Sequence, residues 1–130
     1  MPAYDIATTA FAVGARRKWL DNLTSHHDLP GVQSSKRGVS REFSFEAVVL
    51  VSFIRALTDD LCVPVWRAVE LAIAISGDPD GTLSLPAGIV MSIDTAALAR
   101  QVRQHLLEAA ESVPRIRRGR PPIATPPAGF

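Results

Sequence analysis

Residues 5–23 read DIATTAFAVGARRKWLDNL, a stretch with a single glycine near its middle. Apolar residues recur every three or four positions on both sides of Gly14, which predicts one helix over residues 5–13 and a second over residues 15–25. Asp5 is suited to cap the first helix, and glycine is a common residue where a helix ends. The stretch therefore predicts two short helices joined by a tight turn.

Three cations follow the turn directly. Arg16, Arg17 and Lys18 open the second predicted helix, on the side opposite Leu20 and Leu23, which are expected to face the core. The start of a helix is an unfavourable place for cations, because the helix dipole puts partial positive charge there. Some other interaction must compensate for this unfavourable charge. A helix–turn–helix unit with basic residues at the start of its second helix fits the major groove of DNA.

The segment from residue 26 to residue 42 has no helical period. It contains Pro30, Gly31 and Gly38, and a basic loop lies at residues 33–37. We expect two short strands on either side of this loop, which together form a wing.

Two longer helices are expected next. Residues 45–58 are apolar almost all round and follow Ser44 as the N-cap, which predicts the central buried helix. Residues 64–76 predict a helix that begins at a proline and ends at Gly77. Its apolar face is expected to consist of Trp66, Val69 and Ile73.

The C-terminal half is expected to contain a hairpin and one more helix. Apolar and polar residues alternate on both sides of residues 86–88, which predicts a β-hairpin. A helix is expected over residues 94–113, with an apolar stripe of Leu98, Val102 and Leu106. The hairpin and this helix, with its stripe, are expected to carry a homodimer contact. The alternative for the stripe is packing on the chain's own core. From residue 114 onward the chain is rich in proline and is expected to be an extended, disordered tail.

The fold class that follows is mainly α with a small β wing and a hairpin. Residues 1–76 are the expected winged helix–turn–helix domain, residues 77–113 an extension that dimerises or packs, and residues 114–130 the tail. Residues 15–41 carry a net charge of +4, residues 61–113 a net charge of −3, and the tail four arginines without an acid. Two separate cationic segments are typical of a protein that binds a polyanion.

The order of these elements resembles the DNA-binding domain of MerR-family regulators and of related excisionase-like winged helices. The marks, all within residues 4–76, are Ala10-x-x-x-Gly14, Arg16-Arg17-Lys18-Trp19, Arg41-Glu42-Phe43-Ser44, and Leu57 followed by Leu61-Cys62-Val63-Pro64 and Ala68-Val69-Glu70-Leu71. MerR regulators usually continue into a long dimerising coiled coil with a cysteine-bearing effector site. A hairpin and one helix are expected there instead, so neither effector sensing nor DNA untwisting is implied.

The resemblance implies that the second helix lies in the major groove and that the wing contacts the backbone or the minor groove. The groove-facing group would be Arg16, Arg17, Lys18 and Asn22. Arginine can bind guanine, and asparagine adenine, through two hydrogen bonds at once. The phosphate-contacting group, which sets the position on the duplex without reading sequence, would be Lys36, Arg37 and Arg41. A solvated loop is the alternative for the first two of these.

The tail contains a second motif suited to DNA. Arg117-Arg118-Gly119-Arg120-Pro121 resembles an AT-hook, whose core is Arg-Gly-Arg-Pro. Gly119 has no side chain to clash with the floor of a narrow groove, so the arginines beside it can lie along A·T-rich minor grooves, where negative potential is concentrated. The alternative is a basic tail that binds without sequence preference.

Other residues that carry chemistry are few. Cys62 is the only cysteine, so no disulfide can form within the chain, and a reducing compartment is expected. The adjacent His26 and His27 cannot easily face one ion, so we expect no metal and no other cofactor. No nucleophile or phosphate-loop motif is recognised, and we expect no enzymatic activity. Neither a signal peptide nor a membrane-spanning segment is expected, which favours a cytoplasmic, nucleoid-associated protein.

These features predict a sequence-specific transcriptional regulator that binds double-stranded DNA, with a homodimer as the expected assembly. Two alternatives stay open: an antitoxin-type autoregulator whose C-terminal half binds a partner protein, and an excisionase-like protein that bends DNA. A copurifying partner would favour the first alternative. Measured bending without a change in transcription would favour the second.

Overall fold

The computed structural model describes residues 3–33 and 41–112. These residues form a mainly helical fold with two small antiparallel β-pairs, as the sequence predicts. In chain order the elements are α1 (Ile6–Val13), α2 (Arg17–His26), β1 (Val32–Gln33), β2 (Glu42–Phe43), α3 (Phe45–Asp60), α4 (Val65–Ser76), β3 (Thr82–Ser84), the 3-10 turn η1 (Pro86–Gly88), β4 (Val90–Ser92) and α5 (Thr95–Ser112).

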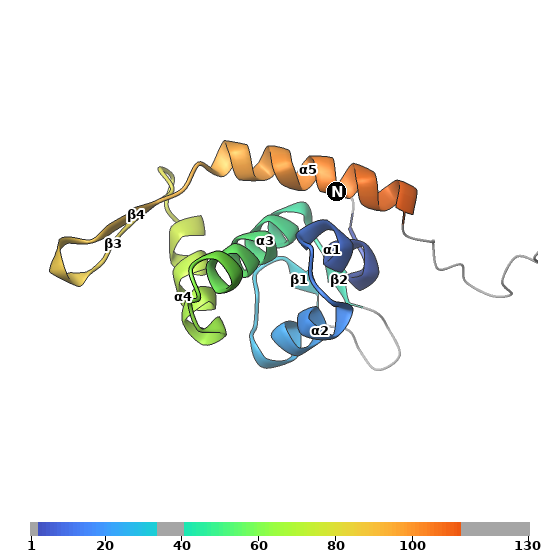
Figure 1. Cartoon of the computed structure of the whole chain (residues 1–130), viewed down its shortest axis with the longest axis horizontal. Coiled ribbons are helices and arrows are strands. Elements are labelled where there is room, and N and C mark those ends of the chain that lie inside the picture. Colours follow the sequence, from blue (N-terminus) through green and yellow to red (C-terminus); the bar gives the residue numbers. More distant parts are fainter. Residues whose placement is uncertain (1–2, 34–40, 113–130) are drawn as a thin grey trace, which may run out of the picture.

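The central helix is α3. Val51 and Ile54 on this helix are fully buried, and α1, α4 and α5 all pack against it. α5 runs across α1 and α3, while α2 lies on the far side of them from α5 (Figure 1). Ser44 caps α3, because its Oγ accepts a hydrogen bond of 3.1 Å from the N–H of Ala47. The predicted buried helix is therefore confirmed, and it extends two residues further than expected, to Asp60.

The turn predicted at Gly14 joins α1 to α2. Gly14 has a φ of 70°, which glycine adopts without strain. The N–H groups of Gly14 and Ala15 donate to the carbonyls of Phe11 and Ala10 at 3.1 and 3.0 Å, the hydrogen-bond pair of a Schellman motif. The second helix begins two residues later than predicted, because Arg16 has an extended backbone and occupies the N-cap position.

A small β-pair supports the start of α3. β1 and β2 are antiparallel, with Val32 opposite Phe43, and this confirms the two strands predicted beside the basic loop. Tyr4 lies against β2 and exchanges two backbone hydrogen bonds of 2.8 Å with the fully buried Phe43. The loop itself, with Lys36 and Arg37, lies outside the described residues.

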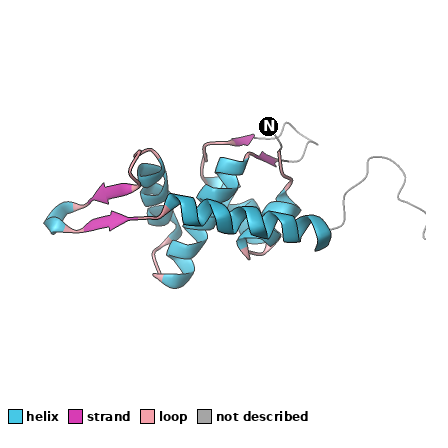
Figure 2. Cartoon of the chain, turned by 90° about the horizontal axis from the view of Figure 1, so that it is seen from above, coloured by secondary structure: helices cyan, strands magenta, loops and turns pink. Residues whose placement is uncertain are grey.

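The predicted hairpin consists of β3 and β4 and turns at η1, with Leu83 opposite Met91. It projects beyond the helices at one end of the molecule (Figures 1 and 2). Asp78 fixes its base, because one carboxylate oxygen accepts hydrogen bonds from the N–H groups of Asp80 and Thr82 at 3.0 and 2.9 Å.

The apolar stripe of α5 packs on the chain's own core. Val102 and Leu106 are only 1% and 7% exposed, and Leu98 is partly buried beside them. Packing on the chain's own core is therefore the interpretation that holds for Val102 and Leu106, and the homodimer contact predicted for these two side chains is wrong, because α1 and α3 already cover them.

The apolar face predicted for α4 is also wrong at its largest residue. Trp66 is 60% exposed, whereas the small residues Ala68 and Ala72 are fully buried together with Ile75. α4 thus turns a different side toward α3 than the one that carries the tryptophan. Among the described residues, no helix has both the length and the apolar composition needed to cross a bilayer.

Candidate nucleic-acid interface

One face of α2 is fixed in the core and the other is open. Leu20 and Leu23 are buried, and Arg55 from α3 lies over the ring of the partly buried Trp19, with its guanidinium carbon 4.9 Å from the ring centre. The predicted groove-facing residues are all exposed: Arg16, Arg17, Lys18 and Asn22. The buried side chains therefore hold the helix in place while the cationic side faces solvent.

The three cations at the start of α2 form no ion pair with any described residue. The ion pairs among the described residues are Arg41–Asp21, Arg55–Asp59 and Arg67–Glu70, and none of them includes these three cations. The segments outside the described ranges contain no Asp or Glu that could neutralise them. Arg16, Arg17 and Lys18 therefore present a concentrated positive charge that suits an anionic ligand.

Arg41 has a different position from the one predicted. Its guanidinium contacts the carboxylate of Asp21 and donates a hydrogen bond of 3.0 Å to the hydroxyl oxygen of Ser25, and both partners lie on α2. The side chain is only 24% exposed. Arg41 is thus not a free phosphate contact; it connects the strand end to α2 and helps to orient that helix.

The C-terminal end of α2 adjoins the beginning of α4. His26 hydrogen-bonds through Nδ1 to the carbonyl of Asn22 at 2.8 Å. A shallow apolar hollow lies beside this turn, lined by Trp19, Asn22, Leu23, His26, His27 and Val65. Periodicity alone did not place α4 here, and the signal that could have done so is the Ala68–Ala72 pair, which marks the buried side of α4 and leaves Val65 and Trp66 exposed.

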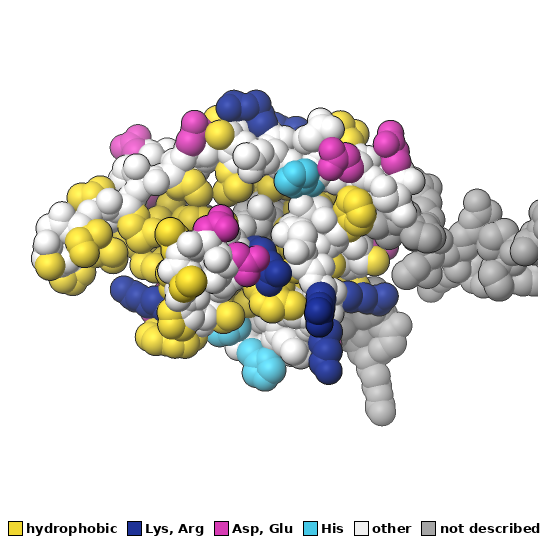
Figure 3. Space-filling view, in the orientation of Figure 1, with side chains coloured by type: hydrophobic (Ala, Val, Ile, Leu, Met, Phe, Trp, Pro, Cys, Tyr) yellow, Lys and Arg dark blue, Asp and Glu magenta, His cyan; other side chains and the backbone are white. Residues whose placement is uncertain are grey.

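Charge is unevenly distributed over the surface. In Figure 3 the Lys and Arg side chains gather where α2 lies, with histidines and exposed hydrophobic side chains beside them. A second set of cations lies at the opposite edge, over α5. The remaining predicted DNA contacts lie outside the described residues: Lys36, Arg37, Arg117, Arg118, Gly119 and Arg120.

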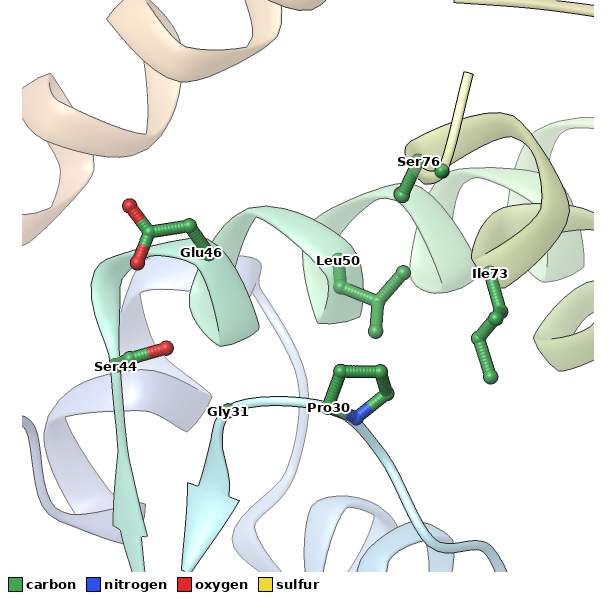
Figure 4. Close-up of a pocket in the computed structure, with 8 residues that line it drawn as sticks. Pro30, Gly31, Ser44, Glu46, Leu50, Ile73 and Ser76 are labelled. Atoms are coloured by element: carbon green, nitrogen blue, oxygen red, sulfur yellow. The ribbon is translucent and has the colours of Figure 1, made fainter. Parts of the chain in front are cut away.

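A separate hollow lies between the Pro30 turn and the helices α3 and α4 (Figure 4). Pro30 and Leu50 point toward one another inside it, whereas Glu46 points away at its rim. Its other lining residues are Gly31, Ser44, Ile73, Ser76 and Gly77. Glu46 is the only charged residue in this lining, and the lining contains no Lys, Arg or His. The hollow therefore does not suit a nucleic acid.

Among residues 3–33 and 41–112, no three His, Cys, Asp or Glu side chains cluster in a way that could hold a metal ion. No protein-family model, curated protein or solved structure matches the chain.

Proposed function

We propose that this chain is a sequence-specific transcriptional regulator that binds double-stranded DNA as a winged helix–turn–helix protein, with α2 in the major groove. One observation carries the proposal. The start of α2 exposes three cations without an acidic partner in the described structure, while Leu20 and Leu23 further along the helix are buried and anchor it. A rigidly held helix with one cationic edge has the dimensions and charge that the major groove accepts.

The side chains on this edge match the chemistry of base recognition. Arg16 and Arg17 can each donate two parallel hydrogen bonds to guanine, and Asn22 can both donate to and accept from adenine. Lys18 and Asn22 are four residues apart, so they lie on the same side of the helix. We assign base contacts to these residues, and phosphate contacts to Lys36 and Arg37 of the wing loop.

The tail motif adds a second contact in this proposal. Arg117, Arg118 and Arg120 would enter the minor groove beside the site bound by α2, with Gly119 against the groove floor. Removal of residues 114–130 should then weaken binding most where A·T-rich sequence flanks the site. An equal loss on every duplex would instead support a basic tail without sequence preference.

The test is a titration of random and selected DNA duplexes with the full chain across a series of salt concentrations. If the protein neutralises about six to eight phosphates, log affinity should fall with log salt at a slope of about −5 to −7. Replacement of Lys36 or Arg37 by Ala should reduce that slope by about one each without changing the preferred sequence.

Arg16→Ala and Arg17→Ala should act differently from the wing variants. Each should cost about 1–3 kcal/mol on the preferred site and less on random DNA, so that sequence preference relaxes. Arg100→Ala is the matched control, because Arg100 is an exposed arginine on α5, on the other side of the molecule from α2 (Figure 1). The proposal is wrong if the wild type does not bind DNA duplexes even at low salt. It is also wrong if Arg100→Ala loses as much sequence preference as Arg16→Ala and Arg17→Ala.

A further inference from the structure

The projecting hairpin has one apolar face and one polar face. Leu83 pairs with Met91, and the N–H of Leu85 donates to the carbonyl of Ile89 at 2.6 Å, which continues the same register toward the turn. Because side chains alternate between the two faces of a strand, one face gathers only apolar residues. These are Leu83, Leu85, Ile89, Met91 and Ile93, and we call them the hairpin face.

The body of the molecule covers the hairpin face only in part. Leu83, Leu85, Met91 and Ile93 are partly buried against the core, whereas Ile89 near the turn is 56% exposed. The hairpin extends away from the helices in both views (Figures 1 and 2). A two-stranded hairpin is marginally stable by itself in water, so an apolar face on a projecting hairpin indicates that another surface completes its packing.

A groove adjoins this face. It lies between the end of α3 and the start of α5, and its apolar lining includes Phe53, Leu57, Leu61 and Leu98. Ile93 belongs to both the groove and the hairpin face, so the two apolar surfaces are continuous. Leu61 is exposed at the edge of the groove. In Figure 3, hydrophobic side chains run along the hairpin and onto the adjoining body.

We infer that the hairpin face and the groove together form a homodimer interface, with a second copy of this chain as the occupant. A protrusion and a hollow on the same continuous surface are self-complementary, which is what a two-fold contact between identical chains requires. Residues 81–93 contain no charged residue, and Asp60 is the one charged residue in the groove lining, so the hairpin of one copy brings no like charge to the groove of the other.

The surface offered to a second copy is small. A hairpin face about 20 Å long and about 10 Å wide has a footprint of roughly 200 Å² per copy, to which the groove adds. This is below the usual size of a stable specific interface, so the contact should be weak and the dimer should dissociate on dilution. This inference does not depend on DNA binding, and it places the dimer contact on the hairpin instead of on the buried stripe of α5.

The test is sedimentation equilibrium of the full chain without DNA, over a wide range of protein concentrations. The wild type should change from monomer to dimer as concentration rises. Ile89→Glu should raise the dimer dissociation constant by at least about tenfold, because a carboxylate would be buried without a partner. Val90→Glu is the matched control: Val90 is the next residue, is 63% exposed, and lies on the opposite face of the same hairpin, so this variant should stay within about twofold of the wild type.

Both substitutions are at exposed positions, and circular dichroism should show that each variant keeps the helical fold. A wild type that stays monomeric at every concentration overturns the inference. So does an equal loss in both variants, since the assigned face would then be wrong. If a different protein copurifies and is released only by Ile89→Glu, the hairpin binds a partner protein and the homodimer is wrong. None of these outcomes decides whether the chain binds DNA.

Discussion

Gly31 lies at a point where the backbone passes close to the cap of the central helix. Its φ is 81°, a conformation that L side chains rarely adopt, and its carbonyl accepts a hydrogen bond of 2.9 Å from the N–H of Ser44. A Cβ added at Gly31 would lie inside contact distance of the Ser44 hydroxyl and 3.1 Å from Cβ of Ala47. This position therefore requires glycine for two separate reasons, conformation and space.

We predict that Gly31→Ala lowers the free energy of unfolding by about 2–4 kcal/mol, since it combines left-handed strain with a steric clash. Gly14→Ala is the matched control, because Gly14 has a similar φ of 70° but open space around the missing Cβ. It should lose only about 1 kcal/mol. Thermal and denaturant unfolding measure both values, and equal losses would show that the contact with Ser44 has no effect.

The clash can be isolated with a second substitution. Ser44→Ala removes the side-chain cap of α3 and should cost about 1 kcal/mol by itself. It also removes the hydroxyl that an alanine at position 31 would meet. The double variant should therefore be more stable than the sum of the two single losses predicts. Strict additivity would mean that the Ser44 hydroxyl adds nothing to the loss at Gly31, which would then come from its φ and from the contact with Ala47.

Asp78 connects α4 to the hairpin through a turn in which its carboxylate accepts hydrogen bonds from Asp80 and Thr82. The backbone N–H of Thr82 is the main group that holds the pKa of this carboxyl below its ordinary value, with help from the Thr82 hydroxyl and the N–H of Asp80. A depressed pKa means that the carboxylate stabilises the turn above the unfolded-state pKa of about 4. This stabilisation is lost as the pH falls through the lower, folded value.

We therefore predict that the turn before β3 opens as the pH is lowered below about 4, while α3 stays folded. The measurement is amide hydrogen exchange of Thr82 followed by NMR. Asp78→Asn keeps an acceptor oxygen and should remove the pH dependence. Asp78→Ala should expose the Thr82 amide at every pH. An unchanged pH dependence in the Asn variant would contradict the role of the carboxylate.

Local signals in the sequence were enough to place most of the elements. Asp5 and Ser44 cap α1 and α3 as predicted, and the turns at Gly14 and at residues 86–88 are where their residue types indicate. These features depend on a few neighbouring residues, so a sequence contains them directly. The coarse fold class follows from them.

The tertiary contacts could not be predicted from the sequence in the same way. Trp66 is large and apolar, which predicts a buried position, but at about 100° per residue it lies on the side of α4 roughly opposite Ala68. The fully buried Ala68 and Ala72 allow α4 to pack against α3, and no periodicity of large residues shows this. The ion pair of Arg41 joins positions 20 residues apart, which spacing does not predict either.

The two proposed binding surfaces, the cations of α2 and the hairpin face, lie on separate parts of the molecule. The exposed cations lie on α2, and the hairpin face lies on the projecting end of the molecule (Figure 1). A substitution in one surface should leave the other intact. If both proposals hold, a weak dimer should still have a large effect on DNA, because two linked α2 helices bind neighbouring half-sites at a high effective concentration.

A selection from random oligonucleotides tests this coupling. The wild type should enrich inverted repeats whose half-sites are about 10 base pairs apart, or a multiple of that, since α2 of each copy must enter the major groove on one side of the duplex. Ile89→Glu should enrich single half-sites of the same sequence, because base contacts are kept and the dimer contact is lost. Val90→Glu should select the same repeats as the wild type.

The half-site sequence tests the base contacts of α2, and the repeat tests the dimer contact of the hairpin face. The selection therefore shows which of the two proposals is wrong. If the wild type enriches single sites only, while its sequence preference is clear, the homodimer does not form on DNA and the predicted coupling between the two surfaces is wrong. If Ile89→Glu still selects repeats, two copies contact each other through some other surface. If Arg16→Ala selects the same bases as the wild type, α2 does not read the major groove, whatever the oligomeric state.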